Sequence, residues 1–351
     1  MITVRRAVAV VVLLAAVGLA AQDKGGLDET GPYDVVENWL KPVHEGWILY
    51  VVGVVAQMPN RVFILSAGET PIQQDGKPLP RTGVFNRSLP GARLDRFLVV
   101  VDENGRPIEE WTQWYKLFNE PHKVMINPYD PEKHLWFVDR VGQQIFVFTN
   151  DGKQLVMTLG EKDVAGTDET HFNLPTDIAF LPDGTFFVGD GYGNSRVVKF
   201  DKNGKFLLAW GSKGKGPGQF DTPHGLAIDR QRRVYVADRG NRRVQVFDEN
   251  GKFLDEFPNM RGPNHLILTQ DQFLWVTDGR ANRVAKFDLT GRLLTYWGVQ
   301  GTFPGALNNT HESSVDSAGN FYTADTLSHT VQKFKPRPNA DPARLIGQPF
   351  K

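Results

Sequence analysis

One segment pattern recurs along this chain of 351 residues and restricts its fold more than any other feature. The copies share a short apolar run, a second run that ends in aspartate and a third run, and in most of them an Asn-Gly or Asp-Gly pair leads to a fourth. The clearest copies lie at residues 172–211 and 220–253. Because glycine adopts the positive φ angles of tight turns, apolar runs separated by these dipeptides are typical of β-hairpins.

Five copies are clear, and a degenerate sixth lies before them within residues 46–114. A period of roughly 40 to 55 residues, with three or four strands in each copy, is typical of β-propeller blades. A single blade cannot bury both faces of its sheet, so neighbouring copies must pack together. The repeats therefore predict an all-β, six-bladed β-propeller over residues 46–335, in place of the two domains that chain length suggests.

A propeller must close into a ring, and the last copy lacks its outermost strand after Phe334. We expect residues 22–45 to complete this last blade and residues 336–351 to form a C-terminal tail. The repeat pattern resembles the NHL repeat family, and the resemblance covers roughly residues 46–335.

The first 21 residues have the organisation of a signal peptide. Arg5 and Arg6 precede an apolar run at residues 7–21, which ends in the small residues Ala20 and Ala21. This order predicts export followed by cleavage. A membrane anchor is the alternative, but the run is shorter than the ~20 residues needed to cross a bilayer. We expect a periplasmic or secreted protein without membrane attachment after cleavage.

Composition narrows the classes of partner and chemistry. The 40 basic and 40 acidic residues give a net charge of zero, so nothing favours binding to nucleic acid or to an anionic membrane. The chain has no cysteine, which excludes thiol catalysis, thiolate metal sites and disulfides. We expect a monomer that acts on a small molecule or a peptide.

The copies align on the aspartate that ends the second run, namely Asp139, Asp190, Asp238, Asp278 and Asp325. Fourteen residues before the last four aspartates stand Thr176, His224, Asn264 and His311, and His122 holds the equivalent position in the copy that carries a small insertion. This position begins the innermost strand, which lines the central channel. Three neutral imidazoles there are a common shell for a catalytic zinc ion, although single histidines at strand starts are usually structural.

Other polar residues lie one position from these landmarks. Arg239 and Arg140 directly follow two of the aligned aspartates, and Tyr192 lies in a glycine-flanked turn after a third. A tyrosine beside a cation and a metal can act as a base, whereas a tyrosine packed on a turn would show the same spacing. Glu312 follows a histidine and offers the oxygen ligands that Ca²⁺ prefers. His265, one residue out of register, is expected to face the other side of its strand.

Residues 172–245 resemble the catalytic core of peptidyl-α-hydroxyglycine α-amidating lyases, through Asp190-Gly-Tyr-Gly-Asn-Ser-Arg and Pro223-His-Gly-Leu-Ala among other motifs. That family is a six-bladed propeller with a zinc ion held by three histidines and a calcium ion in the channel. It cleaves the N–C bond of a C-terminal α-hydroxyglycine and releases a peptide amide and glyoxylate. The resemblance implies the same fold, cofactors and reaction.

The resemblance also implies roles for particular residues. The zinc ligands would be His122, His224 and His311. The calcium ligands would be Glu312, where the family has aspartate, and the carbonyl of Val124. Tyr192 would be the catalytic tyrosine and Arg239 a substrate-site arginine.

One departure concerns the reaction itself, because Ala67 stands where the family has a second arginine. Losing a positive charge beside reacting atoms typically costs orders of magnitude in rate. Three classes of function therefore stay open. The first is an amidating-type lyase, and the second is another metal-dependent enzyme such as a lactonase or hydrolase. The third is an exported propeller without catalysis that binds a peptide, a glycan or a protein.

Overall fold

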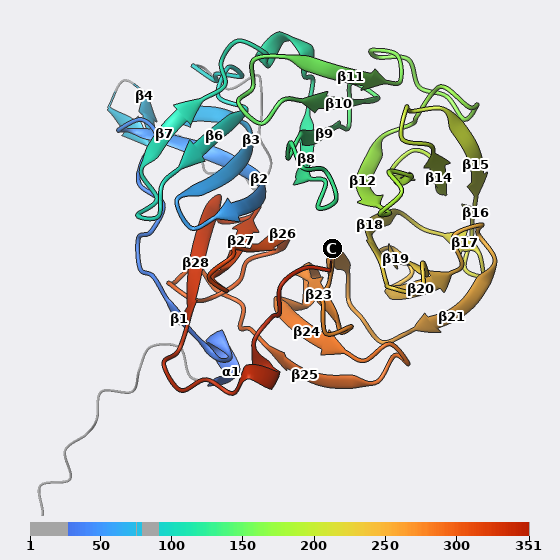
Figure 1. The fold of residues 1–351 in the computed structure, drawn as a ribbon. Coiled ribbons are helices and arrows are strands. Elements are labelled where there is room, and N and C mark those ends of the chain that lie inside the picture. Colours follow the sequence, from blue (N-terminus) through green and yellow to red (C-terminus); the bar gives the residue numbers. More distant parts are fainter. Residues whose placement is uncertain (1–26, 75, 79–90, 351) are drawn as a thin grey trace, which may run out of the picture.

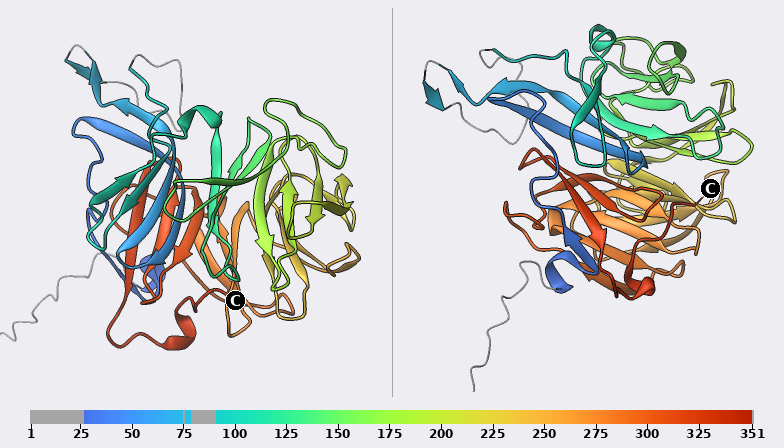
Figure 2. Two further views of the ribbon diagram at one scale, coloured as in Figure 1. Left: turned by 45° about the horizontal axis from the view of Figure 1, so that its top comes forward. Right: turned by 60° about the vertical axis from the view of Figure 1, so that its left-hand side comes forward.

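Six four-stranded antiparallel sheets are arranged around a common axis in the computed structural model (Figures 1 and 2). The structure describes residues 27–74, 76–78 and 91–350. The expected signal peptide, residues 1–21, lies outside the described residues. Within the described residues the all-β, six-bladed architecture that the repeats predict is confirmed. No helix in these ranges is long and apolar enough to cross a membrane.

Each blade runs from an inner strand at the axis to an outer strand at the rim. The first blade contains β2 (Trp47–Met58), β3 (Arg61–Pro71), β6 (Leu98–Val101) and β7 (Pro107–Glu110), and the second contains β8 (Pro121–Ile126), β9 (Leu135–Asp139), β10 (Gln144–Phe148) and β11 (Leu155–Leu159). The third blade contains β12 (Pro175–Phe180), β13 (Phe186–Asp190), β14 (Arg196–Phe200) and β15 (Phe206–Trp210), and the fourth contains β18 (Pro223–Ile228), β19 (Val234–Asp238), β20 (Arg243–Phe247) and β21 (Phe253–Phe257). The fifth blade contains β22 (Pro263–Leu268), β23 (Leu274–Asp278), β24 (Arg283–Phe287) and β25 (Leu293–Trp297), and the sixth contains β26 (Thr310–Val315), β27 (Phe321–Asp325), β28 (Thr330–Pro336) and β1 (Tyr33–Val35).

Short elements lie between and beside the blades. They are the helix α1 (Leu27–Thr30), the paired segments β4 (Gln73–Gln74) with β5 (Lys77–Pro78) and β16 (Ser212–Lys213) with β17 (Gln219–Phe220), and the 3₁₀ turns at Tyr115–Leu117, Gly279–Ala281 and Pro342–Arg344.

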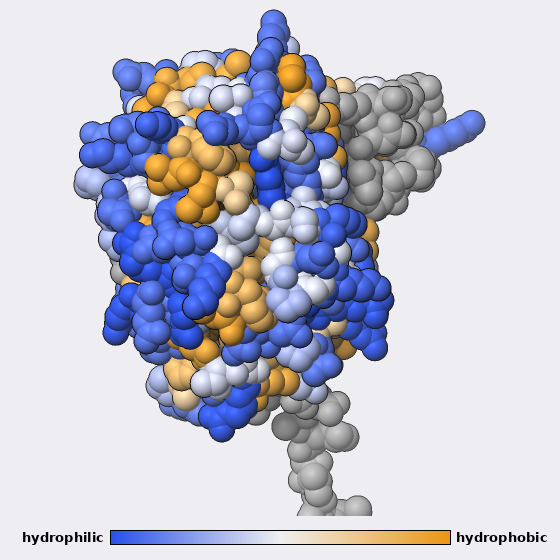
Figure 3. All heavy atoms as spheres, turned by 90° about the vertical axis from the view of Figure 1, so that its right-hand side faces the viewer, coloured by the Kyte–Doolittle hydropathy of each residue, from blue (hydrophilic) through white to orange (hydrophobic). Residues whose placement is uncertain are grey.

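Burial follows the position of each strand in its blade. The inner strands β12, β18 and β22 are buried along their whole length, because neighbouring blades cover both of their faces. The outer strand β15 alternates between half-buried and exposed residues, as expected for a strand with one solvated face. Outer hairpins turn at glycines such as Gly204 and Gly251, with φ of 80° and 84°. Figure 3 shows the resulting rim, on which separate apolar areas alternate with hydrophilic ones.

The ring closes through the N-terminal segment. β1 pairs antiparallel with β28, with Val35 opposite Phe334 and Tyr33 opposite Pro336, and so supplies the outer strand of the sixth blade. The C-terminal segment packs against the same region, since the backbone of Ile346 donates to the hydroxyl of Tyr33 at 2.8 Å. It continues to the inner side of the fifth blade, where the amide of Phe350 donates to the carbonyl of Leu268 at 2.7 Å.

The aspartates that end the second strands fix the segments leading into the inner strands. A carboxyl oxygen of Asp238 accepts from the amide of Asp221, and Asp190 accepts from the amide of Asn173 in the same way. These amides lie just before β18 and β12, so each aspartate anchors the start of its own blade's inner strand. Backbone donors that would otherwise be buried without a partner are satisfied by this contact.

Candidate metal and catalytic site

Three imidazoles from alternate blades meet at one end of the axis. His122, His224 and His311 are each the second residue of an inner strand, on β8, β18 and β26. Their ring centroids lie 4.7 to 5.1 Å apart, and one nitrogen of each lies within 4.8 Å of the others. All three side chains are buried. The structure thus brings together the three histidines that the repeat register singles out.

A β-bulge lies at each of these histidines. The pairing of β8 with β9 shifts between Pro121 and Lys123, and that of β18 with β19 shifts between Pro223 and Gly225. A bulge inserts one residue into a strand and re-aims its side chain. His122 and the residue after it therefore both reach the axis, whereas consecutive residues of a regular strand face opposite sides.

The other three blades orient the imidazoles. In each case Nδ1 of a histidine donates to a backbone carbonyl of the following blade: His122 to Thr176 at 2.9 Å, His224 to Asn264 at 2.7 Å, and His311 to Val52 at 2.7 Å. A carbonyl only accepts, so Nδ1 carries the proton in all three rings. Each Nε2 is left with a lone pair at the axis.

Burial keeps the three imidazoles neutral. It is the main cause that lowers the pKa of His122 and His224 well below the usual value, and it lowers the pKa of His311 to about 3. The Nε2 atoms of His122 and His311 lie 3.2 Å apart, and both carry lone pairs. Two lone pairs at this distance repel each other unless a cation lies near them.

A zinc ion fits these donors. Zn–N bonds of about 2.0–2.1 Å in tetrahedral geometry separate two nitrogens by about 3.3 Å, which is close to the separation of the His122 and His311 nitrogens. Hydrogen bonds from the other ring nitrogen to a carbonyl are the outer contacts that metal-binding histidines usually make. Three imidazoles also leave the fourth position open for a substrate.

Tyr192 lies directly beside the three nitrogens. Its hydroxyl is 3.2 Å from Nε2 of His122 and 3.0 Å from Nε2 of His224, and it accepts a hydrogen bond of 3.1 Å from Nη1 of Arg239. The backbone amide of Tyr192 donates to the carbonyl of Leu174, which holds the turn against its own blade. Of the two residues singled out from the sequence, Tyr192 therefore contacts the histidine cluster, and Arg239 contacts Tyr192.

A second arginine packs against the same tyrosine. The Cζ atoms of Arg140 and Arg239 each lie 4.8 Å from the centroid of the Tyr192 ring. Arg140 also pairs with Glu120 through Nη2. Its buried Nε has no hydrogen-bond partner among the described residues.

A cavity of about 270 Å³ opens onto this group. His122, His311, Tyr192 and both arginines line it, and Ala67 contributes to its wall from the first blade. Ala67, which stands where the resemblance predicts an arginine, thus presents only a methyl group to the cavity. With two guanidinium groups in its wall, the cavity favours a ligand that carries negative charge.

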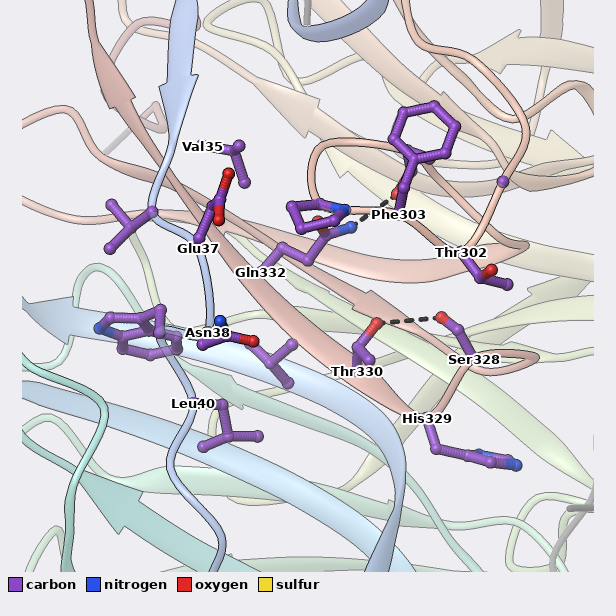
Figure 4. A pocket seen from close by; sticks show the side chains of 16 residues that line it. Val35, Glu37, Asn38, Leu40, Thr302, Phe303, Ser328, His329, Thr330 and Gln332 are labelled. Atoms are coloured by element: carbon purple, nitrogen blue, oxygen red, sulfur yellow. Dashed lines mark hydrogen bonds between the residues drawn. The ribbon is translucent and has the colours of Figure 1, made fainter. Parts of the chain in front are cut away.

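A slightly larger cavity of about 300 Å³ lies beside the closing strand of the sixth blade, and it is lined by none of the three histidines at the axis (Figure 4). Figure 4 shows Val35 and Leu40 of the N-terminal segment on one side, and Phe303 and His329 on the other. Within the described residues, the histidine triad is the only group of three or more potential metal ligands that cluster closely. The chemistry of the site therefore belongs to the smaller cavity.

Glu312, expected as a calcium ligand, contacts a lysine. Its Oε1 lies 3.1 Å from Nζ of Lys123, and its Oε2 accepts from the amide of Val54 at 3.2 Å. At about 4 Å, two unit charges still interact by roughly 4 kcal/mol at an effective dielectric constant of 20. A divalent cation beside this ammonium would be repelled, so the side chains present do not fit calcium. The side chain of Val124 packs in the core between the first two blades.

Two buried charged residues were missed from the sequence. Lys123 and Asp177 directly follow the aligned position on their strands, as Glu312 follows His311. A charge inside an otherwise buried strand was the available signal. His265 shares this position and was expected to face away, but the bulge in β22 between Pro263 and His265 changes its direction. It contacts Ser313 of the sixth blade at 3.1 Å and lies outside the histidine triad.

Parts of the chain match a known repeat family and several proteins of known name. The NHL repeat family matches residues 172–200 and 220–247. The chain is 34% identical over 196 residues to the peptidyl-glycine alpha-amidating monooxygenase of Mus musculus, covering 54% of this chain and 19% of that protein. It is 36% identical over 158 residues to a probable peptidyl-alpha-hydroxyglycine alpha-amidating lyase of Caenorhabditis elegans, covering 44% of this chain and 43% of that protein. The alignments thus span less than half of either relative.

Solved structures share the fold at low sequence identity. A gluconolactonase from Xanthomonas campestris superposes with a TM-score of 0.57 at 14% identity, covering 89% of this chain and 92% of that one. A streptogramin B lyase superposes with a TM-score of 0.56 at 12% identity, covering 87% and 98%. The chain is therefore a six-bladed β-propeller with NHL repeats whose sequence resembles those of peptidyl-alpha-hydroxyglycine alpha-amidating lyases.

Proposed function

We propose that the protein is an exported, monomeric, zinc-dependent lyase that cleaves an α-hydroxyglycine-type substrate into an amide and glyoxylate. One observation carries the proposal: the unprotonated nitrogens of His122, His224 and His311 converge on one point, and the hydroxyl of Tyr192 lies 3.0 to 3.2 Å from two of them. The relatives named as amidating enzymes support the choice of reaction. Residues 1–21 support export.

The reaction needs one proton to move from oxygen to nitrogen while one N–C bond breaks. Zinc bound by the three histidines would polarise a substrate oxygen and make its proton more acidic. Tyr192, acting in its ionised form, takes the proton of the substrate hydroxyl at its phenol oxygen and then returns that proton to the departing amide nitrogen. The carbon that carried the hydroxyl becomes the aldehyde carbon of glyoxylate, so that all atoms and charges balance.

Two arginines assist Tyr192 in this scheme. Arg239 donates to the tyrosine hydroxyl and orients it. Arg140 lies against the ring of the same tyrosine and lines the same cavity as Ala67. We infer that Arg140, from the second blade, supplies the positive charge that Ala67 cannot. Positive charge already in position stabilises the charge of the substrate carboxylate and the negative charge that develops on the substrate oxygen as it loses its proton.

Metal analysis and turnover test the proposal together. Protein purified without added metal should contain about one zinc ion per chain, by the tetrahedral donor set above. His122→Ala, His224→Ala and His311→Ala should lose that zinc, whereas His171→Ala, which changes a histidine on a surface loop, should retain it. The wild-type protein should release glyoxylate and benzamide from α-hydroxyhippurate.

The variant Tyr192→Phe distinguishes a loss of turnover from a loss of zinc. This variant should keep its zinc and lose roughly 10²- to 10⁴-fold in turnover, the usual contribution of a general acid or base. Zinc without glyoxylate release in the wild type would reject the lyase and favour another metal-dependent hydrolase on the same scaffold. Absence of zinc in the folded wild type would reject both enzymes and favour a binding propeller.

A further inference from the structure

The axis contains a second layer of polar side chains beside the histidines. Nζ of Lys123 lies 3.1 Å from Oε1 of Glu312 and 3.4 Å from Oδ1 of Asp177. The three side chains are at most 4% exposed. Lysine is almost never buried to this degree unless it is paired. Each of the three residues directly follows the bulged position of its inner strand, which explains why all three reach the axis.

The carboxylates extend this contact to further blades. Oε2 of Glu312 accepts from the amide of Val54 in the first blade at 3.2 Å. Oδ2 of Asp177 accepts from the amide of Leu226 in the fourth blade at 2.9 Å. The ammonium therefore joins inner strands of the second, third and sixth blades directly, and those of the first and fourth through the two carboxylates.

The first and fourth blades carry glycine at the same position. A Cβ added to Gly53 would collide with Oε2 of Glu312, and one added to Gly225 would lie 2.8 Å from the carbonyl oxygen of Asn264. Gly53 thus leaves room for the Glu312 carboxyl group that pairs with Lys123, and Gly225 lets the fifth blade pack closely against the fourth.

We propose that Lys123 is a built-in cation that joins the inner strands in place of a bound calcium ion, so that this propeller folds and closes without calcium. The ammonium supplies a positive charge beside two buried carboxyl groups that otherwise have only backbone amides as partners, as a divalent cation would. This proposal is independent of the lyase reaction, because it concerns the stability of the ring and its response to calcium.

Thermal denaturation in calcium-free buffer, with one equivalent of ZnCl₂ and no chelator, and in the same buffer with millimolar CaCl₂ tests it. The wild-type protein should have the same Tm in both conditions. Lys123→Ala should lower the Tm in the calcium-free buffer by at least about 5 °C, because it leaves buried carboxylates without their cation. Added CaCl₂ should recover part of that loss, since two carboxylates and the space of the lost side chain then form a set of oxygen ligands.

Two variants serve as controls. Lys333→Ala removes another buried lysine, whose Nζ donates to the carbonyl of Glu103 at 3.0 Å, and should lower the Tm without creating a response to calcium. Lys123→Met keeps most of the side-chain volume and is used if Lys123→Ala does not fold. A wild-type Tm that rises when CaCl₂ is added to the calcium-free buffer, or stoichiometric calcium in the purified wild type, would overturn the proposal. So would a lysine variant that loses no stability.

Discussion

The protonation of three imidazoles is decided by backbone atoms that belong to other blades. His122, His224 and His311 come from the even-numbered blades, and the carbonyls that accept from their Nδ1 atoms come from the odd-numbered ones. This alternation gives the site approximate threefold symmetry within a sixfold ring. It fixes each ring's orientation before any metal binds, which lowers the entropy cost of binding.

At the residue scale, Arg140 is the most informative side chain to change. Arg140→Met keeps much of the side-chain volume but removes the charge beside Tyr192, and we expect kcat to fall by about 10²-fold or more with zinc content unchanged. Glu120→Gln is the matched control, because it removes the partner of Arg140 but leaves the guanidinium in place. Steady-state kinetics on α-hydroxyhippurate check this. An unchanged kcat in Arg140→Met, together with an active wild type, would reject the role of Arg140 but not the lyase.

At the element scale, the sixth blade lacks an ion pair that the third, fourth and fifth blades contain. In the fourth blade Arg243 lies opposite Asp238 and donates to it at 2.9 Å. The equivalent residue opposite Asp325 is Thr330. Asp325 accepts instead from Thr310 and from Gln332. Burial raises its pKa from 3.8 to about 6, and these hydrogen bonds only partly oppose the rise.

This difference predicts a pH dependence of stability. Between about pH 4 and pH 6 the folded state holds a proton on Asp325 that the unfolded chain releases, so the free energy of unfolding falls as pH rises through that window, by up to about 3 kcal/mol. Urea denaturation across the window measures it. Asp325→Asn should remove this component, because the amide does not titrate. Parallel stability curves for the variant and the wild type would contradict the prediction.

Thr330→Arg should introduce the missing ion pair with Asp325 into the sixth blade. A guanidinium opposite Asp325 would reproduce the arrangement of Arg243 with Asp238 and favour the charged carboxylate. We expect the free energy of unfolding at neutral pH to rise by about 1.5 kcal/mol, the lower end for hydrogen bonds to charged groups. The same substitution at Ser212, which is exposed on β16, is the control and should leave stability nearly unchanged. Urea denaturation of both variants decides between these outcomes.

At the scale of the whole molecule, stability depends on how the ring is closed. Tyr33 is fully buried, packs against Trp297 with ring centroids 5.8 Å apart, and accepts from the amide of Ile346. One side chain therefore ties the N-terminal strand and the C-terminal segment to the last two blades. Local contacts alone cannot make this closure, because residues 33 and 346 lie at opposite ends of the chain.

Tyr33→Ala should therefore destabilise the molecule by about 3–5 kcal/mol, the usual cost of truncating a large buried aromatic side chain. Tyr33→Phe should cost only about 1 kcal/mol, through the lost hydrogen bond. Leu207→Ala, on an exposed part of an outer strand, is the comparison and should change little. Urea denaturation measures all three. A loss in Tyr33→Ala no larger than that in Leu207→Ala would show that β1 does not hold the ring closed.

The sequence by itself determined the repeat period, the strands and the position on each inner strand that faces the axis. Fourteen residues separate the aligned position from the aspartate in four copies, so aligning the aspartates also aligns His224 with His311, and the Pro-His pair places His122 in the copy with the insertion. Only the tertiary structure decided which carbonyl orients each imidazole, that Arg140 packs against Tyr192, and that Lys123 lies between Asp177 and Glu312. These contacts join separate blades, and they depend on the β-bulges and on the rotation of the sheets about the axis, neither of which leaves a periodic signal in the chain.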